Sequence, residues 1–90
     1  MARVTVTRVL APKLGGHTFL DVDAATVGAA IEACTGQFEE FGRFILDDRA
    51  RLRQHVNVFL NSELIADRAG LSDAVGPNDT IHIIQSVSGG

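Results

Sequence analysis

The sequence predicts an α+β domain in which one main helix packs on one face of a mixed β-sheet. Near both ends of the chain, apolar and polar residues alternate with the period of a half-buried strand. Between these strands, apolar residues recur three and four positions apart, as on one face of a helix. The length of 90 residues and the hydrophobic content of 46% suit a single packed domain.

The first strand is expected over residues 3–10, which alternate and are rich in Val and Thr. Its phase turns Val4 and Val6 toward the core and Thr5 and Thr7 away from it.

A turn with Pro12 and two consecutive glycines separates this strand from a second one over residues 17–23. We expect Phe19, together with Leu20 or Val22, to point into the core. The connection is short enough for the two strands to pair as a hairpin.

The main helix is expected to follow Thr26, whose side chain can cap the free N–H groups of the first turn. It is centred on residues 27–36. Its apolar face consists of Val27, Ala30, Ile31, Cys34 and Phe38. Residues 38–53 are predicted to form a helical turn laid over the core, followed by an exposed loop.

A third strand is predicted over residues 55–61, with Val56, Val58 and Leu60 facing the core and Phe59 facing outward. A turn then leads to a short return strand that begins with Leu64.

Two further elements and a last strand complete the chain. Residues 71–75 are predicted to form a single helical turn, and residues 76–79 carry a strong turn signal. The last strand covers residues 80–87 and turns Ile81 and Ile83 inward.

The predicted order is strand, strand, helix, strand, short elements and strand. The last strand has room to lie beside the first, in the middle of the sheet. This is the order of the β-grasp, or ubiquitin-like, fold. We expect one domain over residues 1–87 and a flexible Ser-Gly-Gly tail over residues 88–90.

Composition argues against several classes of function. The net charge of −3 gives no support for nucleic-acid binding, which usually shows as a basic patch. The arginines between residues 43 and 53 are interleaved with acidic residues, as in a solvated segment of mixed charge. One cysteine allows no internal disulfide, and no run approaches the ~18 apolar residues of a membrane span. Without a signal-peptide pattern, the chain is expected in the cytoplasm.

The last two residues, Gly89 and Gly90, directly follow a strand-like apolar run. Because glycine has no Cβ, two glycines at a terminus make a stem thin enough for a narrow channel. The terminal carboxylate is anionic near neutral pH and therefore a poor electrophile. Activation by ATP converts such a group to an acyl adenylate, which a sulfur or nitrogen nucleophile can attack. We therefore expect Gly90 to be the carrier residue and Gly89 its steric companion.

Several segments of the C-terminal third carry a family resemblance. They are the strand at residues 56–61, the segment with Leu71, the turn and strand at residues 78–84, and the ending Val-Ser-Gly-Gly at residues 87–90. Together they resemble the MoaD/ThiS family of ubiquitin-like sulfur carriers. Two departures are visible. Gly76-Pro77-Asn78-Asp79 replaces a plainer D-G-D turn, and Gln85-Ser86 stands where molybdopterin-synthase small subunits often have two prolines.

The resemblance implies a carrier, or the small subunit of a two-component synthase, that is not itself a catalyst. An ATP-dependent activating enzyme of the MoeB/ThiF type would adenylate Gly90. A sulfur donor protein would then convert it to a thiocarboxylate. A downstream synthase subunit would use this sulfur to build a cofactor, cysteine, a thiolated nucleoside or a secondary metabolite. The chain itself would bind neither ATP nor another cofactor.

Partner recognition is expected on the outer face of the sheet, away from the helix. Alternation places Phe59, His82 and Ile84 on this face, with Leu64 nearby. Two of these are large apolar groups, and a contiguous exposed apolar patch usually marks a contact surface. In the resembled family this face binds the activating enzyme. An error of one residue in strand phase would instead place these side chains in the core.

Catalytic and metal-binding readings have less support. Cys34 lies on the apolar face of the helix, where a thiol lacks the exposure and cationic neighbour that reactivity needs. His17, His55 and His82 are scattered and lack metal-ligand spacing. No Gly-rich phosphate-binding loop precedes a helix, so ATP is expected on the partner.

Two alternatives remain. The chain is a ubiquitin-like protein modifier if Gly90 forms isopeptide bonds with lysines. It is a β-grasp interaction module if the glycine tail is inert and disordered.

Overall fold

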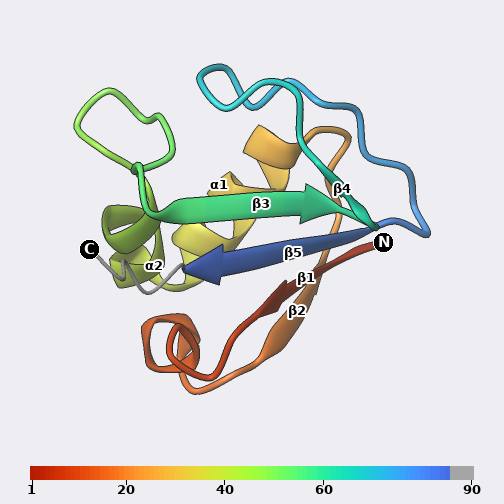
Figure 1. Cartoon of the computed structure of the whole chain (residues 1–90). Coiled ribbons are helices and arrows are strands. Elements are labelled where there is room, and N and C mark those ends of the chain that lie inside the picture. Colours follow the sequence, from red (N-terminus) through yellow and green to blue (C-terminus); the bar gives the residue numbers. More distant parts are fainter. Residues whose placement is uncertain (86–90) are drawn as a thin grey trace.

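The structure is a computed structural model that describes residues 1–85 (Figure 1). Its five strands form one mixed sheet in the order β2-β1-β5-β3-β4. In chain order the strands are β1 (Ala2–Val6), β2 (Phe19–Val22), β3 (Val56–Leu60), β4 (Glu63–Leu64) and β5 (Thr80–Gln85). β1 and β2 form the predicted hairpin. β5 lies in the middle, parallel to β1 and antiparallel to β3, which confirms the predicted β-grasp order.

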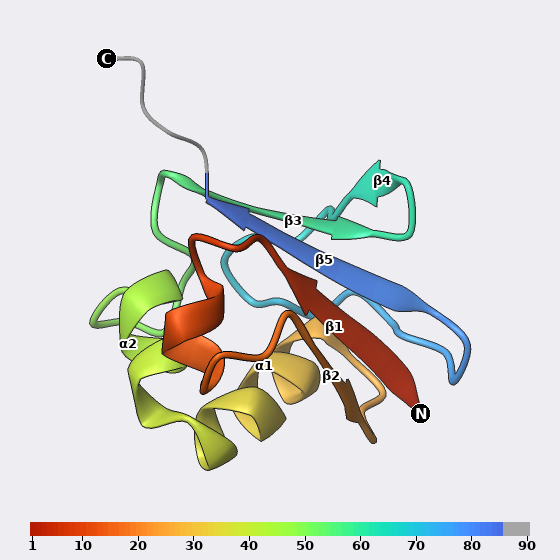
Figure 2. The same cartoon turned by 90° about the horizontal axis from the view of Figure 1, so that it is seen from below.

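Two α-helices cover one face of this sheet (Figure 2). α1 spans Val27–Gln37, and Thr26 caps it as predicted, because its Oγ1 accepts a 3.0 Å hydrogen bond from the N–H of Ala29. The predicted helical turn after Phe38 is a second α-helix, α2, which spans Glu39–Ile45.

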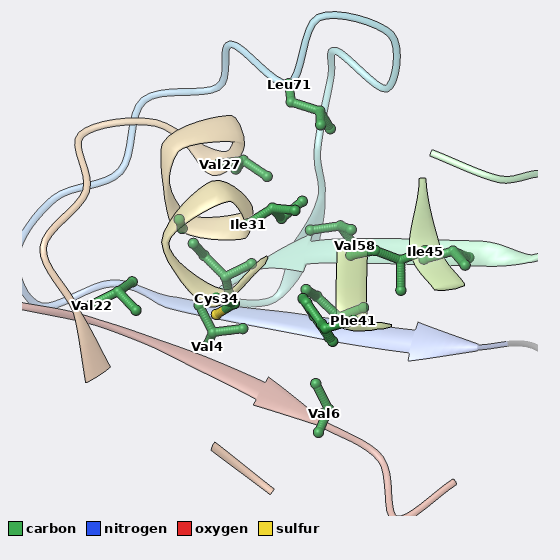
Figure 3. Packing of buried hydrophobic residues seen from close by; sticks show 14 of the residues in the cluster. Val4, Val6, Val22, Val27, Ile31, Cys34, Phe41, Ile45, Val58 and Leu71 are labelled. Atoms are coloured by element: carbon green, nitrogen blue, oxygen red, sulfur yellow. The ribbon is translucent and has the colours of Figure 1, made fainter. Parts of the chain in front are cut away.

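The core lies between the sheet and the two helices (Figure 3). Most of the predicted core is buried, namely Val4, Val6, Val27, Ile31, Val58, Ile81 and Ile83. Leu60 is only partly buried, at the edge of this cluster. From α2, Phe41 and Ile45 are fully buried and close the core at the end of the sheet where β5 stops.

The first strand is shorter than predicted, because β1 ends at Val6 rather than at residue 10. The chain then turns, with the N–H of Leu10 donating to the carbonyl of Thr7, and winds into the 3₁₀ helix η1 (Ala11–Leu14). This turn buries Leu10 and Leu14 fully, so both leucines belong to the core although neither is part of a longer strand.

The predicted helical turn at residues 71–75 is wrong. Leu71 has φ of 55°, and the segment pairs with the start of α1 instead of coiling. The N–H of Val27 donates to the carbonyl of Asp73, and the N–H of Val75 donates to the carbonyl of Ala25. Leu71 and Val75 are both buried, so their four-residue spacing matches a helix without forming one.

Candidate functional site

The predicted carrier residues Gly89 and Gly90 lie outside the described residues, as do Ser88 and the last two residues of the predicted final strand. The described chain ends at Gln85, which closes the central strand β5 and pairs with Val56 at the start of β3. The terminal segment therefore follows directly from the middle of the sheet, at the end where β1 stops and β3 begins (Figure 2).

Strand register brings one residue from each strand into a single row across the outer face of the sheet. Phe59 pairs with Leu64 of β4 and with His82 of β5. His82 pairs with Thr5 of β1, and Thr5 pairs with Phe19 of β2. Directly paired residues point to the same face, so these five side chains form what we call the outer row. It contains three of the four predicted partner-binding residues.

The fourth, Ile84, lies two positions beyond His82 on the same face of β5. Ile84 is 37% exposed and Leu64 is 59% exposed, whereas Ile81 and Ile83 are fully buried. The predicted alternation of β5 is therefore confirmed.

An open hollow of about 410 Å³ lies on this face, and its lining includes Thr5, Thr7, Phe59, Asn61, His82 and Ile84. Within it, Thr5 Oγ1 and His82 Nδ1 are hydrogen-bonded at 2.7 Å. These two polar groups bond to each other, beside the apolar surfaces of Phe59 and Ile84. The hollow is wide enough to receive an apolar side chain.

Phe19 was predicted to lie in the core, and this is wrong. It is 46% exposed at the β2 end of the outer row, while Leu20 and Val22 take the inward positions. The sequence contained a signal for this phase, because Asp21 must share a face with Phe19.

Phe19 is also held in place by its neighbours. The Arg3 guanidinium lies 4.2 Å from the centre of the Phe19 ring, and Arg3 Nε is 2.9 Å from Asp21 Oδ1. The hydrogen bond between these partners lowers the pKa of Asp21 and raises that of Arg3. A charged pair therefore fixes an aromatic ring at the edge of the outer row.

The thiol of Cys34 and the rings of His17 and His55 are not part of the outer row. Cys34 is fully buried, which raises the pKa of its thiol to about 11 and keeps it protonated near neutral pH. His17 packs beside the Phe38 ring, and His55 packs beside the Phe44 ring.

Across residues 1–85, no three or more His, Cys, Asp or Glu side chains gather as a metal site would require. Within the same range, neither α-helix has the length and apolar character to cross a membrane.

Comparison with known proteins identifies the family. The ThiS family sequence profile matches residues 4–90. The chain belongs to the ThiS family. Among relatives of this ThiS-family chain is the sulfur carrier protein CysO of Mycobacterium tuberculosis, 26% identical over 89 residues that span 97% of this chain and 96% of CysO. Small archaeal modifier protein 1 of Haloferax volcanii is 35% identical over 83 residues, which span 90% of this chain and 91% of the relative.

Solved structures agree with this assignment. The crystal structure of SAMP1 from Haloferax volcanii matches this ThiS-family chain with a TM-score of 0.83 and 29% identity, over 99% of this chain and 98% of SAMP1. A chain of the Amycolatopsis orientalis BexX/CysO complex matches with a TM-score of 0.88 over the whole of both chains. At 24% identity, the second likeness shows the shared β-grasp fold alone.

Proposed function

We propose that this chain is a sulfur carrier whose reactive group is the carboxylate of Gly90. An activating enzyme of the MoeB/ThiF type adenylates this carboxylate with ATP. Sulfide supplied by a donor protein then attacks the acyl adenylate, so that a C–S bond forms, the C–O bond to AMP breaks, and a thiocarboxylate and AMP result. The observation that carries the proposal is the ThiS family match, because it extends to residue 90 and so includes both terminal glycines. The nearly full-length likeness to the sulfur carrier CysO supports it.

The proposed contact surface for the activating enzyme is the outer row together with Ile84. Phe19, Leu64 and Ile84 are large and apolar, yet they are exposed on this face. Such anchors tend to supply most of the energy of an interface. A sulfur donor and a downstream synthase subunit need the same terminus, so we expect the three partners to bind in turn. The solved BexX/CysO complex of Amycolatopsis orientalis supports a protein partner for a carrier of this fold.

A second function is favoured by one observation, the 35% identity to small archaeal modifier protein 1. In that case activated Gly90 would acylate a lysine and form an isopeptide bond. The two outcomes differ in mass. A thiocarboxylate is about 16 Da heavier than the carboxylate because sulfur replaces oxygen, whereas a conjugate gains the mass of its target.

The test is ATP–pyrophosphate exchange with a MoeB/ThiF-type enzyme from the same organism, followed by intact mass. Deletion of Gly89 and Gly90 should abolish exchange while leaving thermal stability almost unchanged, because a terminal stem has few contacts to lose. Gly90→Ala should impair exchange, since the added methyl group must fit where the channel closes around the backbone. Ser88→Ala, which keeps the length and terminus, should exchange normally. Full exchange by the truncated chain would show that the terminal carboxylate is not the reacting group.

A further inference from the structure

The length of the terminal segment limits where a partner can sit. Five residues follow Gln85, and an extended chain spans at most about 3.5 Å per residue, so Gly90 lies within about 17 Å of Gln85. The domain itself measures 35 × 27 × 24 Å. A protein that encloses Gly90 must therefore lie close to the end of the domain where β5 stops.

That end of the domain is also where the basic residues gather. η1, α2 and the loop of residues 46–55 lie there, beside the ends of β1 and β5 (Figure 1, Figure 2). Residues 7–18 and 37–55 contain six of the eight Lys and Arg residues but only four of the eleven Asp and Glu residues. The rest of the chain contains two basic residues and seven acidic ones. The chain is acidic overall, but this end of the domain is basic. The C-terminal segment continues from the same end.

The loop of residues 46–55, here called the arginine loop, has a fixed shape. Asp47 Oδ1 accepts hydrogen bonds from the N–H groups of Arg49, at 2.8 Å, and Arg51, at 3.0 Å. Ala50 has φ of 59°, a left-handed conformation that is unfavourable for a residue with a Cβ. Leu52 is buried beneath the loop and pairs with Leu46. This conformation leaves the side chains of Arg49 and Arg51 exposed.

These two arginines are available for a partner. The neighbouring contacts join Arg43 to Glu39, Lys13 to Glu40, and Arg53 to the carbonyl oxygen of Arg43. Within residues 1–85, neither guanidinium of Arg49 or Arg51 has a hydrogen-bond or ion-pair partner. Hydrogen bonds from the backbone N–H groups of Arg51 and Arg49 lower the pKa of the Asp47 carboxyl, and the charge of Arg51 adds to this effect. Asp48 is the other acidic side chain of the loop.

We propose that Arg49 and Arg51 bind an acidic surface of the activating enzyme, at the mouth of the channel that takes the terminal glycines. This inference rests on the proposed carrier function. Guanidinium groups bind carboxylates with paired hydrogen bonds, and complementary charge raises association rates more than it raises affinity. An acidic partner surface would repel this carrier in most orientations and attract its basic end. The carrier would therefore approach with its terminus foremost.

The test compares two double variants that lower the net charge equally. Arg49→Gln/Arg51→Gln removes two positive charges at the basic end, and Ser62→Asp/Asn78→Asp adds two negative charges at exposed turn positions at the other end. ATP–pyrophosphate exchange is measured against carrier concentration at about 50 mM and about 500 mM salt. The arginine variant should raise the KM for the carrier about 5- to 20-fold at low salt, with kcat unchanged, and by much less at high salt. The control should stay within about twofold of the wild type.

An unchanged KM in the arginine variant would overturn the proposal, and so would an equal rise in the control, which would mean that net charge alone matters. A KM that rises equally at both salt concentrations would also overturn it. Binding of tRNA by the wild type that is lost in the arginine variant, without a change in KM, would assign the loop to nucleic acid instead. A wild-type chain that supports no exchange at all would contradict the carrier function itself.

Discussion

Single side chains determine what the outer face of the sheet can bind. Thr5 Oγ1 and His82 Nδ1 bond to each other at the centre of the outer row. Phe59 and Ile84 border the hollow with apolar surface, and Phe19 extends that surface to the edge of the sheet. The face is therefore suited to an apolar protein surface.

Changing Phe59, Ile84 or Phe19 to Glu should weaken binding to the activating enzyme about tenfold or more, because a charge would replace an apolar anchor. All three side chains lie outside the core, so each variant should remain folded by circular dichroism. Asn78→Glu adds the same charge at an exposed turn and should bind normally. Binding is measured by titration of labelled carrier. Wild-type affinity in a folded Phe59→Glu/Ile84→Glu variant would remove this face from the interface.

Cys34 should be inert in the native protein. Burial raises the pKa of its thiol to about 11, so at pH 8 little thiolate is present and reagents have no access. Alkylation by iodoacetamide, followed by mass spectrometry, should be about 100-fold slower in the native than in the unfolded chain. The thiol of the unfolded chain ionises at lower pH than the buried thiol, so deprotonation favours the unfolded chain. The free energy of unfolding is therefore unaffected by this thiol below about pH 9 and declines as the pH rises toward 11.

The exposed control for this measurement is Ser62→Cys in a Cys34→Ala background, which should react quickly in the folded protein. If native Cys34 reacts as fast as this control, the helix face that contains it is not packed as described.

At the scale of elements, the contact between α1 and α2 depends on a glycine. A Cβ at Gly42 of α2 would lie 2.6 Å from Thr35 Oγ1 of α1, and that hydroxyl donates to the carbonyl of Ile31. Gly42→Ala should therefore lower the free energy of unfolding by about 1–3 kcal/mol through overpacking. In a Thr35→Ala background the same change should cost less than about 1 kcal/mol, because Oγ1 and Cγ2 are gone and the contact with the Cβ of residue 35, at 3.1 Å, is the one that stays.

Gly36 is the matched control, since it also lies in a helix but has open space where its Cβ would stand. Gly36→Ala should stabilise the protein by up to about 1 kcal/mol through helix propensity. Urea denaturation measures all four variants. Additive effects of Gly42→Ala and Thr35→Ala would contradict a direct contact between these residues.

The elements with a clear period could be predicted from the sequence. β3, β5 and α1 matched closely, because each buries one face and its pattern records that burial. The prediction that Phe19 lies in the core failed because Phe19 and Leu20 are both apolar. The pairing of β2 with β1 decides which of them faces inward. The prediction of a helical turn at residues 71–75 failed because two buried apolar residues of a non-helical segment happen to lie four positions apart.

At the scale of the molecule, topology converts these local patterns into a candidate site. The four predicted contact residues come from three strands, and only the register of the sheet shows that three of them form one row. The same topology places the interleaved charges of residues 39–53 at the end of the domain where β5 stops and the C-terminal segment begins. From the sequence alone, the alternation of positive and negative residues in this segment indicated only a solvated segment of mixed charge.

The central position of β5 also determines how the domain bears mechanical load. β5 is bonded to β1 on one side and to β3 on the other, and both ladders run along its length. Tension on the terminus acts along β5, so it shears both ladders at once instead of peeling bonds apart one by one. A strand at the sheet edge has only one ladder to resist the same load. A partner can therefore grip the terminus, and the carrier can be drawn out of a narrow channel, while the domain stays folded.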